Sequence, residues 1–174
     1  MTTESGHPPQ IVVMGVSGSG KTTAGEALGA RLGLRYSDAD GFHPQANVDK
    51  MATGQALTDD DRWPWLDRIG EWLESYRDSG AIVSCSALRR VYRDRLRDKV
   101  PGAAFWHLSG PQELVQRRMD ARKNHFMPAS LLQSQYETLE PLEDDEYGLT
   151  TDLDQSVEAL VNEFVDWLRQ HPAP

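Results

Sequence analysis

The sequence predicts an α/β fold, a three-layer α/β/α sandwich built around a five-stranded parallel sheet. Segments typical of strands alternate with segments of helical spacing along the whole chain, which is the pattern of parallel βαβ units. The first apolar run leads directly into a glycine-rich loop, Gly15–Thr22, and a helical segment follows. The chain has 174 residues, enough for one hydrophobic core, so residues 1–174 are expected to form a single domain with its core at about 10–170.

Five short runs of residues are expected to form the sheet, the first of them the apolar run Ile11–Met14. Each run is bounded by glycine, proline or polar residues, and a helical segment separates it from the next. The expected strands are Ile11–Met14, Leu34–Ser37, Ala81–Cys85, Ala103–Leu108 and Gly148–Thr151.

Apolar residues three and four positions apart mark the helices, and glycine or proline marks their ends. Gly33 and Gly80 are placed to end helices, Pro101 to stop a basic one, and Pro64 to lie in the first turn of another, after an acidic turn at Thr58–Arg62. The expected helices are Thr22–Leu32, His43–Thr53, about 64–79, Arg89–Lys99, Pro111–Arg122, Pro128–Thr138 and Gln155–Gln170.

Composition excludes several classes of function. The formal net charge is −9, from 27 acidic and 18 basic residues, which argues against bulk nucleic-acid binding. Cys85 is the only cysteine, so the chain has no intrachain disulfide, and Cys85 is expected to pack as a small apolar residue. No apolar stretch approaches the ~20 residues of a membrane-spanning helix, and the first ten residues lack a signal-peptide core, so a cytoplasmic protein is expected.

The loop GVSGSGKT is a complete phosphate-binding motif in the strand–loop–helix context of P-loop NTPases. Gly15, Gly18 and Gly20 allow the backbone to turn its N–H groups toward a phosphate, and the following helix N-terminus adds positive potential. Lys21 is expected to reach the β- and γ-phosphates of ATP, and the Thr22 hydroxyl to bind Mg²⁺. The expected nucleotide-binding residues are Gly15, Val16, Ser17, Gly18, Ser19, Gly20, Lys21, Thr22 and Thr23.

Two carboxylates follow the second expected strand, at the edge of the sheet where ligands bind. In an extended segment Asp38 and Asp40 would face the same side. We assign Asp38 to Mg²⁺, and Asp40 to the attacking hydroxyl of an acceptor, as its base. The third strand ends in Ser-Cys-Ser without an acid, which strengthens the case for Asp38. The alternative is a solvated turn that uses aspartate for its turn chemistry.

Three further blocks identify a family in combination with the loop. DADGFHPQANVDKMATGQALTDDDRWPWL (38–66), CSALRRVYRDRLR (85–97) and ARKNHFMPASLLQSQYETLEP (121–141) resemble the small P-loop gluconate kinases, and the resemblance covers about residues 11–170. It implies transfer of the γ-phosphate of ATP to the 6-hydroxyl of D-gluconate. The product, 6-phosphogluconate, feeds the pentose phosphate or Entner–Doudoroff routes. The resemblance also favours a homodimer.

A substrate region at about residues 41–80 is expected to bind this sugar acid. Its carboxylate needs a cation, for which Arg62 is the first candidate, and Arg89, Arg90 and Arg93 are alternatives in a basic block that could instead be a solvated helix face. The residues expected to bind the hydroxyl groups are His43, Ser86 and Gln135, although His43 could instead begin a helix. His125 is a further expected substrate-binding residue.

Arg118 and Arg122 lie four residues apart on one expected helix face, before an irregular segment. In the resembled kinases this segment, at about 122–128, is a lid over ATP that excludes water and brings cations to the transferring phosphoryl group. We expect Arg122 to reach phosphate as a catalytic residue with Lys21 and Asp40, and Arg118 to lie near the nucleotide. The alternative is surface ion pairing with Asp120 or Glu113.

Two other functions remain open. One is another small-molecule kinase of the same fold, such as a shikimate or nucleoside monophosphate kinase. The other is a nucleotide-binding regulatory module without an acceptor, although the chain lacks the Asn-Lys-x-Asp motif that GTPases use to read their base.

Overall fold

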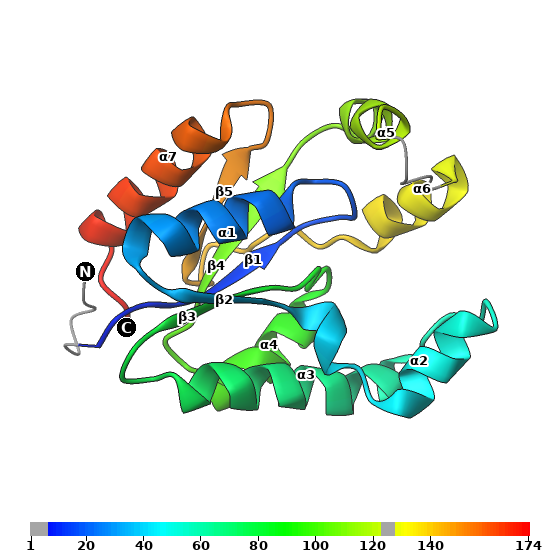
Figure 1. The fold of residues 1–174 in the computed structure, drawn as a ribbon, viewed down its shortest axis with the longest axis horizontal. Helices are drawn as coiled ribbons and strands as arrows, with labels where there is room; N and C mark the ends of the chain where they lie inside the picture. The colour runs from blue at the N-terminus through cyan, green and yellow to red at the C-terminus, as the bar shows by residue number, and fades with distance from the viewer. Residues whose placement is uncertain (1–6, 123–127) are drawn as a thin grey trace.

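The sheet has five parallel strands, as expected. A computed structural model describes residues 7–122 and 128–174 of the chain. The strand order is β2-β3-β1-β4-β5, with β1 in the centre (Figure 1). Ile11 of β1 is in register with Ile82 of β3 on one side and with Ala104 of β4 on the other. The strands are β1 (Gln10–Met14), β2 (Arg35–Asp38), β3 (Ala81–Ser84), β4 (Ala104–Ser109) and β5 (Gly148–Asp152).

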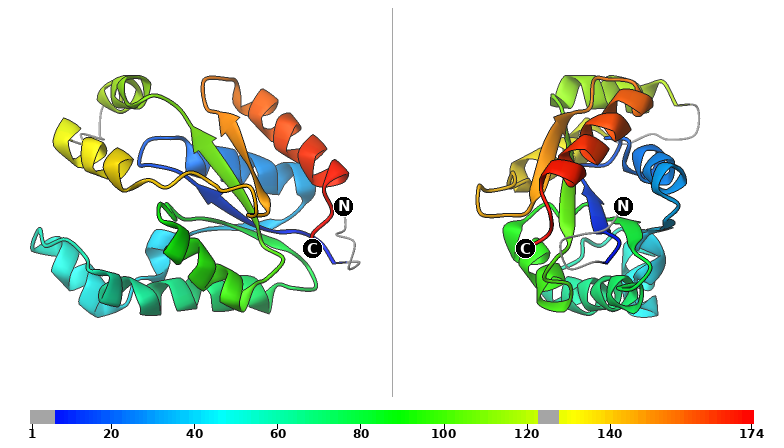
Figure 2. Two further views of the ribbon diagram at one scale, coloured as in Figure 1. Left: turned by 180° about the vertical axis from the view of Figure 1, so that it is seen from behind. Right: turned by 90° about the vertical axis from the view of Figure 1, so that its left-hand side faces the viewer.

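Helices cover both faces of the sheet and form the two outer layers (Figures 1 and 2). Alternate residues of β1 point to opposite faces: Ile11 and Val13 join the core under α1 (Lys21–Leu32) and α7 (Val157–Gln170). Val12 and Met14 join a second core under α3 (Asp59–Ser75) and α4 (Arg90–Lys99). The remaining elements are η1 (Ala39–Phe42), α2 (Gln45–Ala52), α5 (Gln112–Asp120) and α6 (Ala129–Thr138). None of the helices in the described part of the chain combines the length and apolarity that a membrane crossing requires.

The start of α3 differs from the expectation. The expected acidic turn at Thr58–Arg62 is the first turn of the helix, and Pro64 lies inside α3 and not in its first turn. The Thr58 side chain accepts from the Asp61 N–H at 3.2 Å, and the Asp61 carboxylate accepts from the Thr58 N–H at 2.8 Å, which completes a capping box. Lys50 of α2 also binds Asp61, at 2.6 Å. The helix therefore begins one and a half turns before the proline, because its first N–H groups are capped.

Replacing Thr58 by Ala is expected to lower the free energy of unfolding by about 1 kcal/mol, because a side-chain cap of the α3 N-terminus is lost. Urea denaturation followed by circular dichroism measures the change. Ser156→Ala removes the equivalent cap of α7, where the Ser156 hydroxyl accepts from the Ala159 N–H at 3.1 Å, and serves as the matched variant. An unchanged unfolding free energy in Thr58→Ala, with the expected loss in Ser156→Ala, would contradict the stabilising role of the capping box.

Candidate active site

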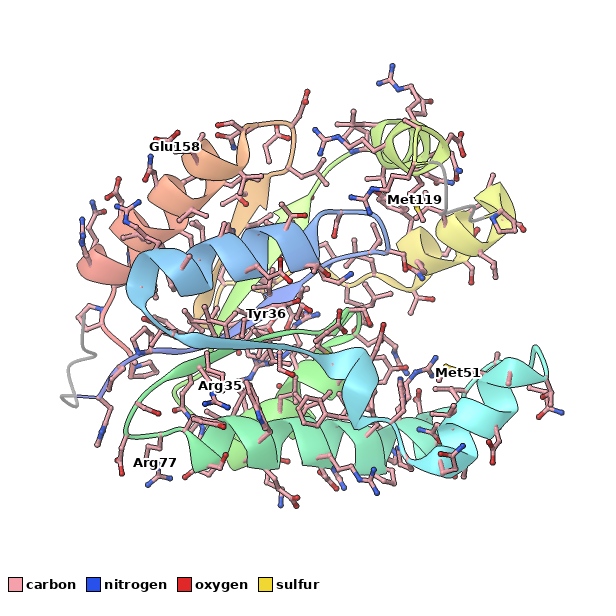
Figure 3. The ribbon with its side chains drawn as sticks, in the orientation of Figure 1. Arg35, Tyr36, Met51, Arg77, Met119 and Glu158 are labelled. Atoms are coloured by element: carbon pink, nitrogen blue, oxygen red, sulfur yellow. The ribbon has the colours of Figure 1, made fainter. Side chains whose placement is uncertain are left out.

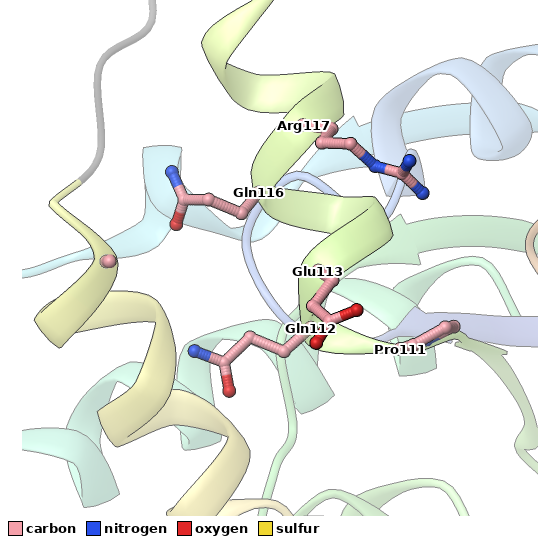
Figure 4. A pocket seen from close by; sticks show the side chains of 6 residues that line it. Pro111, Gln112, Glu113, Gln116 and Arg117 are labelled. Atoms are coloured by element: carbon pink, nitrogen blue, oxygen red, sulfur yellow. The ribbon is translucent and has the colours of Figure 1, made fainter.

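The predicted loop, the two aspartates and part of the predicted substrate region line one cavity at the carboxyl ends of β1, β2 and β3. Its volume is about 540 Å³. The lining residues are Ser17, Gly18, Lys21, Thr22, Asp38, Asp40, His43, Leu57, Arg62, Trp65, Ser84, Cys85, Ser86, Met119, Arg122 and Gln135. A separate hollow between α5 and α6, lined by Gln112, Glu113 and Arg117 among others, contains none of the predicted site residues (Figure 4).

The glycine-rich loop has the shape that phosphate binding requires. Gly18 and Gly20 have φ values of 81° and 96°, which L side chains rarely adopt, and Gly20 leads directly into α1. A Cβ at Gly18 would lie 2.5 Å from Met119 Cγ, because Met119 of α5 packs against the loop (Figure 3). The Lys21 ammonium donates to the carbonyls of Gly15 at 2.9 Å and Val16 at 3.0 Å, and burial lowers its pKa. Lys21 is therefore held over the loop whose backbone can cradle a phosphate.

We expected Asp38 and Asp40 to be two positions of one extended segment. Both line the cavity, but the structure places them in different elements. Asp38 ends β2, and Asp40 lies in the one-turn helix η1. The Asp38 carboxylate accepts from the Asp40 N–H at 2.9 Å and so caps this turn. Burial raises the pKa of Asp40, and the charge of Asp38 raises it further. A side-chain cap, which the periodicity did not indicate, therefore brings the two carboxylates together.

The donor set suits a magnesium ion that is bound mainly through nucleotide phosphates. Thr22, Asp38 and Asp40 supply oxygen atoms around the cavity. No group of three or more acidic, histidine or cysteine side chains among the described residues could hold a metal by itself. Mg²⁺ typically uses one or two carboxylates and completes its shell with water and phosphate oxygens, so these residues fit that ion.

Arg62 reaches the cavity from α3 with one of its three guanidinium nitrogens, Nη1, engaged. Its Nη1 lies 3.3 Å from Asp59 Oδ1 and 3.3 Å from the Tyr92 hydroxyl. The Asp59 carboxylate also accepts from Tyr92 at 2.6 Å and from Arg89 Nη1 at 2.8 Å. Nε and Nη2 of Arg62 have no partner among the described residues. Arg62 and Arg89 therefore share one internal carboxylate, that of Asp59, and Arg62 binds it through Nη1 alone.

The Nε–Nη2 edge of an arginine already binds carboxylates elsewhere in the molecule. Arg93 uses this edge on Glu146, at 2.7 and 3.0 Å, and Arg95 uses it on Asp67, at 2.7 and 2.8 Å. The same edge of Arg62 is open. Such planar, bidentate pairing combines two charge-assisted hydrogen bonds with a defined geometry and suits the binding of a carboxylate.

The structure corrects the expectations for the basic helix. Arg93 is fully buried, and its five N–H groups bind Glu146 and the carbonyls of Ala87, Leu88 and Pro141, so it cannot receive a substrate carboxylate. Arg90 pairs with acidic residues that precede β5: its Nη2 lies 2.9 Å from Asp145, and it also contacts Glu143. The solvated-face interpretation is therefore wrong for Arg93, which lies in the core. Arg90 and Arg95 lie on a partly exposed face of α4 and pair with acidic residues of the chain itself.

Other predicted residues take several positions. Ser86 lines the cavity, and Arg89 is engaged by Asp59 without lining it. Gln135 lines the cavity but binds the phosphate loop, since its Oε1 accepts from the Ser17 N–H at 2.7 Å and its Nε2 donates to Ser17 Oγ at 3.0 Å. Cys85 is buried, and burial raises its pKa to about 12, so it is a protonated thiol, as expected for a packing residue.

The two arginines near the expected lid, Arg118 and Arg122, lie in different surroundings. Arg122 lines the cavity. Arg118 instead donates to the carbonyl of Leu153 at 3.2 Å and lies 3.3 Å from Asp154, between α5 and the segment after β5. Its partner is therefore neither of the acids that we considered, Asp120 and Glu113. His125 and most of the expected lid lie outside the described residues.

Four residues of the site had no signal in the sequence pattern. Asp59, Tyr92 and Asn47 engage Arg62 or His43, and Trp65 stacks on His43 with ring centroids 4.3 Å apart. All are polar or aromatic residues that match ordinary helix positions. Only the packing of α2, α3 and α4 brings them next to Arg62 and His43, which line the cavity.

Comparisons with known proteins agree with this architecture. The family model described as shikimate kinase matches residues 17–169. A gluconokinase from Gluconobacter oxydans (strain 621H) is 43% identical over 166 residues, covering 94% of this chain and 93% of its own length. A crystal structure of a gluconokinase from Sinorhizobium meliloti 1021 has 47% identity and a TM-score of 0.85, covering 94% of this chain and 93% of that one. A sugar kinase structure from Janibacter sp. HTCC2649 has 49% identity and a TM-score of 0.85, covering 93% and 95%.

Proposed function

The chain belongs to the shikimate kinase family of P-loop kinases, among its gluconokinases, and on this premise we propose that it phosphorylates D-gluconate on its 6-hydroxyl, with ATP as the donor. The products are 6-phosphogluconate and ADP. Gluconokinases at 37–45% identity over most of the chain support this reaction.

The single observation that carries the acceptor class is the open edge of Arg62 in the same cavity as Lys21 and Asp40. An acid with a hydroxyl at its far end needs a cation for its carboxylate and a base for its hydroxyl. Arg62 and Asp40 supply these two groups from α3 and η1. Ser86 and His43 line the cavity with them and can bind the hydroxyls of the acceptor.

In the proposed reaction the 6-oxygen of gluconate forms a bond to the γ-phosphorus, and the bond from that phosphorus to the β–γ bridging oxygen breaks. Asp40 accepts the proton of the 6-hydroxyl. Lys21 and Arg122 stabilise the charge on the transferring phosphoryl group and the leaving ADP. Thr22 and Asp38 would hold Mg²⁺, which when bound neutralises charge on the β- and γ-phosphates.

A coupled assay of ADP formation over a panel of acceptors tests the function. We expect turnover with D-gluconate, and little with shikimate, nucleoside monophosphates or the neutral analogue D-gluconamide. Turnover with another acceptor and none with gluconate would assign the chain to a different small-molecule kinase. Tight ATP binding without phosphorylation of any acceptor would instead support a regulatory module.

The assembly and location are also part of the proposal. We propose a cytoplasmic homodimer, on the basis of the resemblance to gluconate kinases. Sedimentation equilibrium of the purified chain tests the assembly, since a monomer at assay concentrations would contradict it.

A further inference from the structure

His43 lines the cavity with its ring plane already defined. The imidazole stacks on the indole of Trp65, with the planes at 11° to each other. Trp65 is 7% exposed and its Nε1–H donates to the carbonyl of Ala39 at 2.8 Å. The surface on which His43 stacks is therefore held by η1, the element that carries Asp40. Stacking alone does not decide which ring nitrogen carries a proton.

The side chain of Asn47 determines which ring nitrogen of His43 carries the proton. It comes from α2, is only 4% exposed, and places Nδ2 2.9 Å from the carbonyl of Asp61 and 3.3 Å from His43 Nδ1. A backbone carbonyl can only accept a hydrogen bond, so the amide nitrogen, and not Oδ1, must face Asp61. The same NH₂ group has a second hydrogen for His43 Nδ1. The Nδ1 atom must then be the acceptor, so the ring proton lies on Nε2.

We propose that Asn47 is a positioning residue that keeps His43 neutral and protonated on Nε2, so that His43 only donates hydrogen bonds to the acceptor. His43 Nε2 has no partner among the described residues. A histidine that accepted the acceptor's proton would compete with Asp40 as the base. A donor instead binds a hydroxyl oxygen and leaves the removal of the proton to Asp40. The role toward the acceptor rests on the proposed function, whereas the tautomer does not.

The electrostatic surroundings agree with a neutral ring. Burial lowers the pKa of His43, Asp40 of η1 opposes this effect, and Arg62 of α3 adds to it. Among the residues that the structure describes, Asp40 and Arg62 are the charged groups that shift the pKa of this ring. The Asp61 carboxylate nearby is engaged by Lys50 and by the Thr58 N–H.

The unmodified protein provides the first test, without substrate or variant. Two-bond ¹H–¹⁵N spectra of histidine-labelled protein at mildly alkaline pH distinguish the two neutral tautomers of each of the five histidines. The His43 signals are assigned by their loss in His43→Gln. We expect protonated Nε2 and bare Nδ1. A protonated Nδ1 would overturn the proposal, whatever the substrate of the enzyme is.

Two substitutions of His43 test the donor role. Gln places an amide N–H near the position of Nε2, and Asn places it near Nδ1. We expect His43→Gln to keep the KM for gluconate within about 3-fold and His43→Asn to raise it about 10-fold, with the KM for ATP unchanged in both, since one neutral hydrogen bond is lost only in the second. Equal losses, or a greater loss in His43→Gln, would contradict a donor at Nε2.

Asn47→Asp replaces the hydrogen-bond donor beside His43 Nδ1 by an acceptor, because an ionised carboxylate can only accept hydrogen bonds. We expect Nδ1 to become protonated in the same spectra. The KM for gluconate should then rise with pH between about 6 and 8, as the ring loses its Nε2 proton, whereas the unmodified enzyme should show no such rise. Gln45→Ala, on the same helix, removes an exposed hydrogen bond to Asp49. It should change neither the tautomer of His43 nor the pH dependence of the KM for gluconate. An unchanged tautomer in Asn47→Asp would show that Asn47 does not set it.

Discussion

Replacing Asp40 by Asn is expected to lower kcat for gluconate phosphorylation about 10³-fold, with the KM values for ATP and gluconate changed only a few-fold. Asn can still occupy the start of η1 and contact a hydroxyl, but it cannot take a proton. In the proposed reaction Asp40 acts on the acceptor hydroxyl, whereas Lys21 and Thr22 act on the nucleotide, so the loss of Asp40 should affect the transfer step and not nucleotide binding. Steady-state kinetics and ATP binding by calorimetry separate these effects.

Asp60→Asn is the matched control, because Asp60 is an exposed carboxylate in the first turn of α3 and the same change of charge occurs outside the cavity. It should leave kcat within about 2-fold, as surface substitutions usually do. If Asp40→Asn retains turnover within a few-fold of the unmodified enzyme, Asp40 is not the base, and the proposed mechanism is wrong at that step.

Replacing Arg62 by Met is expected to lower kcat/KM for gluconate about 100-fold, because a bidentate, charge-assisted pair with the substrate carboxylate is lost. Turnover of D-gluconamide, which has no carboxylate, should fall much less. The ratio of kcat/KM for gluconate to that for gluconamide therefore reports the loss of the Arg62–carboxylate contact and not a general disturbance of α3. Arg62→Lys should recover part of the loss, since it restores the charge but not the planar edge.

Arg77→Met changes the same charge beyond the other end of α3, away from the cavity (Figure 3), and should leave the acceptor ratio unchanged. Equal losses for gluconate and gluconamide in Arg62→Met would mean that Arg62 supports the fold of the site without binding the carboxylate. The carboxylate would then have to be assigned to another cation.

Much of the fold was predictable because local sequence signals agree with the final structure. All five strands lie within about a residue of the expected bounds. The three central strands, β3, β1 and β4, are apolar runs that the sheet buries, whereas the edge strands β2 and β5 are more polar and more exposed. The start of α3 was not predictable from Pro64, because proline marks a helix start only when no better cap precedes it, and Thr58 with Asp61 is the better cap.

The site was predictable in part. The loop through Thr22 could be recognised because its chemistry depends on backbone conformations that particular residues at fixed spacing allow. The Asp38 and Asp40 side chains meet in the cavity, but through a capped turn that the two-residue period of a strand does not describe. Among the arginines of α4, charge alone could not separate a substrate ligand from Arg93, which the acidic segment before β5 buries.

The sequence by itself determined the layered α/β fold, the phosphate loop and the family, because each depends on neighbours along the chain or on blocks of contiguous residues. Only the tertiary structure decided which polar side chains are free to act. Arg93 is buried against Glu146 and Arg118 pairs with Asp154, whereas Arg62 keeps an open edge and His43 an open nitrogen. The physical reason is that a hydrogen-bond donor pairs with the acceptor nearest to it in space. Asp59, Asn47 and Glu146 come within reach of their partners only when the helices pack.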